Sequence, residues 1–260
     1  MFSNLISSIN FRIDKFQIII NGKKQEAFFF RPSETNKLMS VITFLHGHIN
    51  KPESFDPVIG FSSYWLPYVM QGWSIFLPLM PGSCGSEGED DFAGPETISC
   101  LSASIHNILL HIPNINRSKV IIHGFSKGAM SAALLLEQPS SPFKAAILQS
   151  GIYDFRHHYE TAKDETVRSR IEKITQNDEE AFRIRSAITA VSSITCPLLI
   201  LHGNNDQVVD VGESLQFSEQ LNIFHKIHQT IIYEQGDHRL TGAQKQVSDA
   251  IEAFLHKHVL

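Results

Sequence analysis

The chain has 260 residues, of which 42% are hydrophobic and 19% charged, a balance typical of a folded globular protein rather than a disordered or fibrous one. Lys and Arg number 22 against 27 Asp and Glu, a net charge of -5, and no basic cluster stands out, which argues against nucleic-acid binding. No apolar run approaches the ~18 residues that a membrane span requires.

The beginning of the chain lacks the pattern of a secretory signal, because no basic segment precedes an apolar stretch. The three cysteines, Cys84, Cys100 and Cys196, are an odd number at scattered spacings, which does not suggest a disulfide framework. We therefore expect a cytoplasmic protein with a single domain over residues 1–260; nothing in the pattern indicates an oligomeric state.

Short β-rich runs alternate with helix-length segments along the chain. The expected strands are 16–20, 27–31, 39–45, 74–78, 120–122, 145–149, 198–201 and 230–233, and the expected helices are 61–71, 95–111, 127–137, 212–224 and 242–256. The first two strands are joined by Asn21-Gly22, a strong turn signal. Strands separated by helices predict an α/β fold with a mostly parallel sheet and helices on both faces.

Residues 154–185 depart from this pattern, because almost half of them are charged. Tyr159, Val167 and Ile171 recur within this insertion at roughly helical spacing, which predicts one or two amphipathic helices. These helices are either a surface connection or a lid over the active site; as a lid, their apolar side chains would line a pocket for a short acyl group.

The sequence Gly124-Phe125-Ser126-Lys127-Gly128 fits the pattern G-x-S-x-G. A β-branched strand leads into it and a helix of small and apolar residues follows, so the pattern occupies a strand–turn–helix. This context is typical of a nucleophile elbow, in which a strained turn holds the serine above the sheet. The alternative is a serine that caps an ordinary helix.

A nucleophilic serine needs a base, and the base needs an orienting acid. Asp206 follows the strand 198–201 and His238 follows the last strand, which is the chain order expected after such an elbow. Asp154 and Asp210 are alternatives for the acid.

Two backbone N–H groups should form the oxyanion hole of an acyl-transfer site. One is expected from Lys127, the residue after the serine, and the other from His48, in the loop after the third strand. The Lys127 side chain is either solvated or favours an anionic group.

This constellation resembles the α/β-hydrolase family, most nearly its single-domain serine hydrolases of the prolyl-oligopeptidase-like and dienelactone-hydrolase-like groups. The matching pieces are 45–47, 82–88, 124–128, 196–209 and 236–238. The resemblance implies an eight-stranded, mostly parallel sheet, a Ser–His–Asp triad and no cofactor.

We therefore expect a serine hydrolase that cleaves a small acyl ester through an acyl-enzyme intermediate, with a peptidase or a thioesterase as alternatives. Two other classes stay open. His46, His123 and His202, each followed by glycine at a strand end, could serve a metal-dependent hydrolase, and the same fold could serve a non-catalytic binding protein.

Overall fold

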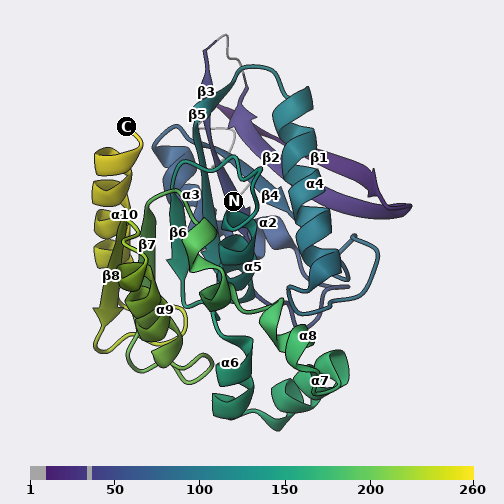
Figure 1. Cartoon of the computed structure of the whole chain (residues 1–260). Coiled ribbons are helices and arrows are strands. Elements are labelled where there is room, and N and C mark those ends of the chain that lie inside the picture. Colours follow the sequence, from purple (N-terminus) through teal and green to yellow (C-terminus); the bar gives the residue numbers. More distant parts are fainter. Residues whose placement is uncertain (1–9, 34–36) are drawn as a thin grey trace.

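The computed structural model describes residues 10–33 and 37–260 and is drawn in Figure 1. Residues 1–9, on which the expected absence of a secretory signal depends, lie outside the described residues. Among the described residues, no helix combines the length and the apolar character needed to cross a membrane.

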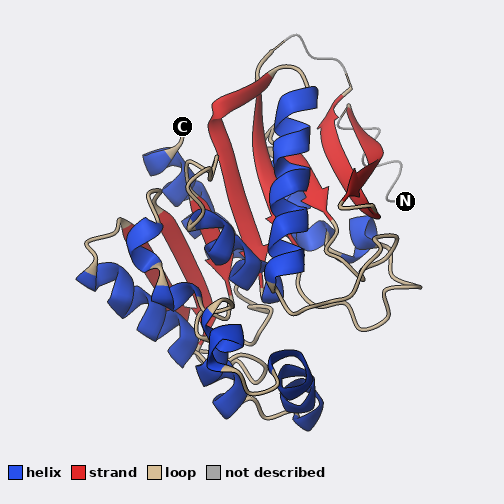
Figure 2. Ribbon diagram, turned by 45° about the vertical axis from the view of Figure 1, so that its right-hand side comes forward, coloured by secondary structure: helices blue, strands red, loops and turns tan. Residues whose placement is uncertain are grey.

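An eight-stranded sheet forms the centre of the molecule (Figures 1 and 2). Its order is β1-β2-β4-β3-β5-β6-β7-β8. Strand β2 runs antiparallel to β1 and β4, and all other neighbours are parallel, which confirms the predicted mostly parallel sheet. The strands are β1 (Phe11–Ile20), β2 (Lys23–Pro32), β3 (Met39–Leu45), β4 (Ser74–Pro78), β5 (Ile115–Phe125), β6 (Ala146–Gln149), β7 (Leu198–Gly203) and β8 (His228–Tyr233).

Helices cover both faces of this sheet, as expected for parallel strands joined by crossover connections. They are α2 (Pro57–Gly60), α3 (Ser62–Met70), α4 (Pro95–His111), α5 (Lys127–Leu136), α6 (Phe155–Thr161), α7 (Glu165–Thr175), α8 (Glu179–Arg183), α9 (Gly212–Ile223) and α10 (Gln244–His258), with two short 3-10 turns at Ala187–Thr189 and Val191–Ser193.

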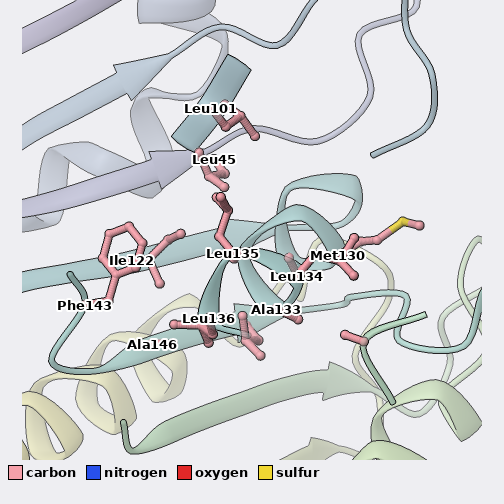
Figure 3. Close-up of a cluster of buried hydrophobic side chains, with 14 of the residues drawn as sticks. Leu45, Leu101, Ile122, Met130, Ala133, Leu134, Leu135, Leu136, Phe143 and Ala146 are labelled. Atoms are coloured by element: carbon pink, nitrogen blue, oxygen red, sulfur yellow. The ribbon is translucent and has the colours of Figure 1, made fainter. Parts of the chain in front are cut away.

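The core divides into two apolar layers, because alternate residues of each central strand point to opposite faces. Leu198 and Ile200 of β7 belong to the layer under α4, α5 and α9, whereas Leu199 and Leu201 belong to the layer under α3 and α10. Figure 3 shows the first layer, where buried side chains of α5 pack against the sheet. This packing fixes the position of α5, whose first residue follows Ser126.

The insertion forms three short helices, α6, α7 and α8, rather than the one or two that the sequence predicted. Each begins after an aspartate whose side chain accepts backbone N–H groups of the first turn: Asp154, Asp164 and Asp178. These caps divide the segment, because each satisfies the free donors of a new helix start. In both Figures 1 and 2 the three helices gather at one end of the molecule.

Candidate active site

Ser126 stands at a sharp turn between β5 and α5. Its backbone has φ 56° and ψ -122°, a conformation that non-glycine residues adopt only under constraint. A side chain at Gly124 would collide with the backbone of Gly128, and one at Gly128 would collide with that of Leu45. The two glycines therefore allow the close approach of strand and helix that a nucleophile elbow requires.

Ser126, His238 and Asp206 form one hydrogen-bonded chain. The Oγ atom of Ser126 lies 3.0 Å from Nε2 of His238, and Nδ1 of His238 lies 2.7 Å from Oδ2 of Asp206. The three residues come from the ends of β5, β7 and β8, at the same edge of the sheet. The structure therefore brings together the serine, acid and base that the sequence nominated.

The Asp206 carboxylate is held from several sides. Its Oδ1 atom accepts the backbone N–H groups of Val208 and Val209, at 2.8 and 3.0 Å, and its Oδ2 atom contacts His238 and His202. Burial alone would raise the pKa of this carboxyl, but hydrogen bonds from His202 and His238 hold that pKa well below its usual range. Asp206 is therefore ionised at neutral pH.

The two alternative acids have other tasks. Asp154 accepts the backbone N–H groups of Arg156 and His157 at the start of α6, and Asp210 accepts that of Gly212. Of the three aspartates, Asp206 is the one in hydrogen-bond contact with His238.

The His46-Gly47-His48 loop lies directly beside the serine, since a Cβ atom on Gly47 would be 3.3 Å from that of Ser126. The Nδ1 atom of His46 lies 2.7 Å from the carbonyl oxygen of Gly47, and its Nε2 atom accepts the backbone N–H of Met80. The described residues contain no cis peptide bond. Because C=O and N–H point in opposite directions across a trans peptide, the pinned Gly47 carbonyl turns the His48 N–H away from the His46 ring.

The side chain of Lys127 is neither solvated nor free for an anion. It is 4% exposed, and its Nζ atom lies 2.5 Å from Oδ2 of Asp90. The same oxygen lies 2.6 Å from Arg170 of α7 and 3.6 Å from Nδ1 of His48. Burial raises the pKa of Asp90, whereas His48, Lys127 and Arg170 together hold it well below its usual range. Asp90 and Arg170 were missed by the sequence analysis, because only the fold brings their segments together.

A pocket of about 270 Å³ opens beside Ser126 and is lined partly by the insertion. Burial lowers the pKa of His158, which lines this pocket, to about 4, so its ring is neutral at neutral pH. The sequence predicted that Tyr159, Val167 and Ile171 of the insertion would line a pocket, and of these three Val167 does so. The expectation for the other two was wrong: Tyr159 packs on Phe182, and Ile171 is fully buried in the core.

The three strand-end histidines do not converge on a metal site. His46 contacts Gly47 and Met80, His123 contacts Tyr68, and His202 contacts Ser214 and Asp206. Within residues 10–33 and 37–260, no group of three or more His, Cys, Asp or Glu residues is arranged to hold a metal ion.

Known proteins resemble this chain in sequence and in fold. A peptidase of Bacillus subtilis, the uncharacterized YtmA, is 27% identical over 224 residues, which cover 84% of this chain and 82% of that protein. An acylaminoacyl peptidase of Pyrococcus horikoshii superposes with a TM-score of 0.82 at 22% identity. That match covers 100% of this chain but 44% of the peptidase, so this chain spans less than half of it.

A third protein, an esterase of Pyrococcus furiosus, superposes with a TM-score of 0.72 at 16% identity, covering 98% of this chain and 94% of the esterase. At such identities these structural likenesses show the fold, which is that of the α/β-hydrolases.

The family assignment comes from the sequence itself. The model of the prolyl oligopeptidase family matches residues 105–259, more than half of the chain, and this range contains Ser126, Asp206 and His238. The chain thus belongs to the prolyl oligopeptidase family and is a serine-type hydrolase with the α/β-hydrolase fold.

Proposed function

We propose that this hydrolase cleaves small acyl esters through an acyl-enzyme intermediate, with Ser126 as nucleophile, His238 as base and Asp206 as orienting acid. The observation that carries the proposal is the hydrogen-bonded chain of these three side chains beside a pocket. A neutral serine hydroxyl reacts slowly, and a histidine within hydrogen-bond reach supplies the missing base.

In the first step, Ser126 Oγ attacks the acyl carbon while His238 Nε2 takes the hydroxyl proton. The tetrahedral intermediate collapses as the protonated His238 returns this proton to the departing alkoxide, leaving the acyl group on Ser126. Water then attacks the acyl carbon by the same sequence, with His238 again as base, and the acid is released. Asp206, which stays ionised, stabilises the positive charge on His238 in both steps.

The oxyanion of each tetrahedral intermediate is assigned to the backbone N–H groups of Lys127 and His48. Lys127 is the first residue of α5, so its N–H is among the free donors at a helix start, where the helix dipole also favours negative charge. The pinned Gly47 carbonyl supports the assignment of His48, because it leaves that N–H directed away from the His46 ring. Donors fixed before reaction stabilise developing charge without reorganisation.

The pocket volume and lining favour a short acyl group. Apolar side chains of Phe92, Ile152, Val167 and Val209 line a space of about 270 Å³, which is at the small end for a ligand site. The insertion acts in this proposal as a lid, tied to the loop before α4 by the ion pair of Arg170 and Asp90.

A second candidate, a peptidase, is favoured by the family assignment and by the peptidases to which the chain is similar. The same nucleophile, base and acid can also cleave an amide bond. Amides demand more of the acid that protonates the leaving nitrogen, and they need subsites for an extended chain.

Labelling tests the proposed chemistry. A fluorophosphonate probe should label Ser126 in the wild-type protein and leave Ser126→Ala unlabelled. Ser126→Ala should also lower turnover by roughly 10⁴-fold or more, with an unchanged circular dichroism spectrum. Full activity of this variant would contradict the mechanism.

The choice between ester and peptide requires matched substrates. We expect kcat/KM for a nitrophenyl ester of a short acid to exceed that for a peptide nitroanilide by more than the difference in leaving group explains. Comparable efficiency on the anilide would instead support the peptidase.

A further inference from the structure

His202, at the end of β7, is a second histidine on the Asp206 carboxylate. Its Nε2 atom lies 3.1 Å from Oδ2 of Asp206, the same oxygen that His238 Nδ1 contacts at 2.7 Å. We propose that His202 is a positioning residue of the active site, which acts on the base through Asp206 without touching substrate. The proposal rests on the function proposed above, and it assigns a role to one of the strand-end histidines that the triad leaves out.

The contacts of the His202 ring place its proton. Nε2 faces two acceptors, Oδ2 of Asp206 and, at 3.2 Å, the carbonyl oxygen of Val209. An atom between two acceptors must donate, so Nε2 carries a hydrogen. Nδ1 lies 2.7 Å from the hydroxyl of Ser214, which can donate or accept. Ser214 thus fixes the orientation of the ring that directs Nε2–H at Asp206.

The arrangement satisfies the carboxylate completely. Two backbone N–H groups bind Oδ1 and two imidazoles bind Oδ2, which uses the four acceptor sites that a carboxylate offers. The side chains of His202 and Asp206 are both 0% exposed. If His202 were lost, no solvent water would be at hand to replace its hydrogen bond, and hydrogen bonds to a buried charge are strong ones.

Sharing of one oxygen by two histidines has a directional consequence. His202 draws part of the negative charge of Oδ2 toward itself, so it weakens the attraction of Asp206 for a proton on His238. Without His202, protonated His238 is stabilised, and the base is lost at a higher pH. Asp206 also interacts electrostatically with His158 of α6 and with Asp237 in the loop after β8, and both residues are present in the wild-type protein and in every His202 variant.

The chain offers a matched control. His123 is also a buried histidine before a glycine at a strand end, but its Nδ1 atom contacts the hydroxyl of Tyr68, 2.9 Å away, and it has no hydrogen bond to the triad. A change at His123 repeats the loss of a buried imidazole without touching Asp206.

The test compares pH profiles of kcat and KM for His202→Leu, His202→Gln and His123→Leu. We expect His202→Leu to lower kcat about tenfold or more with little change in KM, because Asp206 loses a hydrogen bond that fixes its position against His238. The altered charge on Asp206 should separately move the acid limb of the profile upward by about half a pH unit. His202→Gln keeps an N–H near the position of Nε2 and should restore most of both. His123→Leu should lower stability without moving the acid limb.

A low-field proton NMR resonance of the hydrogen between His238 and Asp206 gives a readout that needs no substrate. It should shift in His202→Leu and stay in His123→Leu. Ser214→Ala, a milder change, should cause a smaller shift of the same sign if His202→Leu fails to fold. The role of His202 would be overturned if His202→Leu left both the acid limb and the resonance in place. It would also be overturned if His202→Leu moved the acid limb to lower pH. Absent fluorophosphonate labelling of wild-type Ser126 would instead overturn the proposed function.

Discussion

The ammonium group of Lys127, the residue that follows the nucleophile, lies 2.5 Å from Oδ2 of Asp90. Burial lowers the pKa of this lysine, and Asp90 opposes the effect. The buried ammonium of Lys127 therefore has Asp90 as its main counter-charge. Asp90 also contacts Arg170, whose side chain is 30% exposed. The two partners are therefore unequal. Asp90 pairs with a second cation, Arg170, whereas Lys127 depends mainly on Asp90 for its counter-charge.

This inequality predicts the cost of each substitution. Asp90→Asn should lower the free energy of unfolding by about 3 kcal/mol, because it leaves a buried ammonium uncompensated. Lys127→Met should cost less, since Asp90 keeps Arg170, and the double variant should be more stable than Asp90→Asn alone. Urea denaturation of the four proteins in a double-mutant cycle measures these differences. Equal costs for the two single variants would contradict the asymmetry.

The assignment of the acid predicts unequal effects at two aspartates. Asp206→Asn should lower kcat by roughly 10⁴-fold, because an amide favours the wrong tautomer of His238. Asp154→Asn should change kcat little, since asparagine also caps a helix and Asp154 has no hydrogen bond to His238. Steady-state kinetics with a nitrophenyl ester distinguish the two. If Asp154→Asn were the more damaging change, the acid would be misassigned.

Three buried histidines predict how stability depends on pH. Burial lowers the pKa of His46 to about 4, of His123 to about 3 and of His158 to about 4, against about 6.5 in the unfolded chain. Below pH 6.5 the unfolded chain therefore binds protons that the folded protein does not, so stability falls as the pH decreases toward about 4, by about 1.4 kcal/mol per pH unit for each histidine.

Urea denaturation between about pH 7 and 5 measures this slope. His123→Leu should reduce the slope by about 1.4 kcal/mol per pH unit, the contribution of one histidine, whatever effect the substitution has on stability at neutral pH. A slope unaffected by this substitution would mean that His123 is not held neutral by burial.

The lid proposal predicts a difference between two arginines of α7. Arg170→Gln breaks the ion pair with Asp90, so it should raise KM and speed proteolytic cleavage within 154–185. Arg168→Gln should do neither, because its contacts, to Ala162 and Glu165, stay inside the insertion. High salt should raise the wild-type KM toward that of Arg170→Gln, since this partly exposed pair is screened. Equal protease sensitivity of both variants would argue against a lid held by Arg170.

The sequence predicted most of the sheet and its helices, because both depend on local patterns. Strand 74–78 and helix 95–111 have the predicted bounds, since polar or glycine-containing turns flank both segments. Strand β5 is longer than predicted, because its first half, Ile115–Lys119, is mostly polar and partly exposed and so lacks the continuous apolar signal of Val120–Ile122. Helix α2 was missed because four residues carry no period.

The residues of the site also fall into those that a local sequence pattern predicts and those that it does not. Ser126, Asp206 and His238 each follow a recognisable strand, so chain order and spacing suffice to nominate them. Asp90, Arg170 and His202 act through contacts between distant segments or through a hydrogen-bond direction, and neither leaves a pattern in the sequence. Lys127 shows the limit well, since the burial of its side chain depends on a loop 37 residues away.

The left-handed backbone of Ser126 means that the protein keeps its reactive residue in a conformation that opposes folding. A non-glycine residue in such a conformation stores roughly 1–3 kcal/mol of strain, and the packing of α5 against the sheet supplies the force that maintains it. Glycine at this position would relieve the backbone strain but would lack the hydroxyl, so the residue that best fits the turn would be inactive. Activity here is retained against a local preference of the chain, and stability alone would select against the serine.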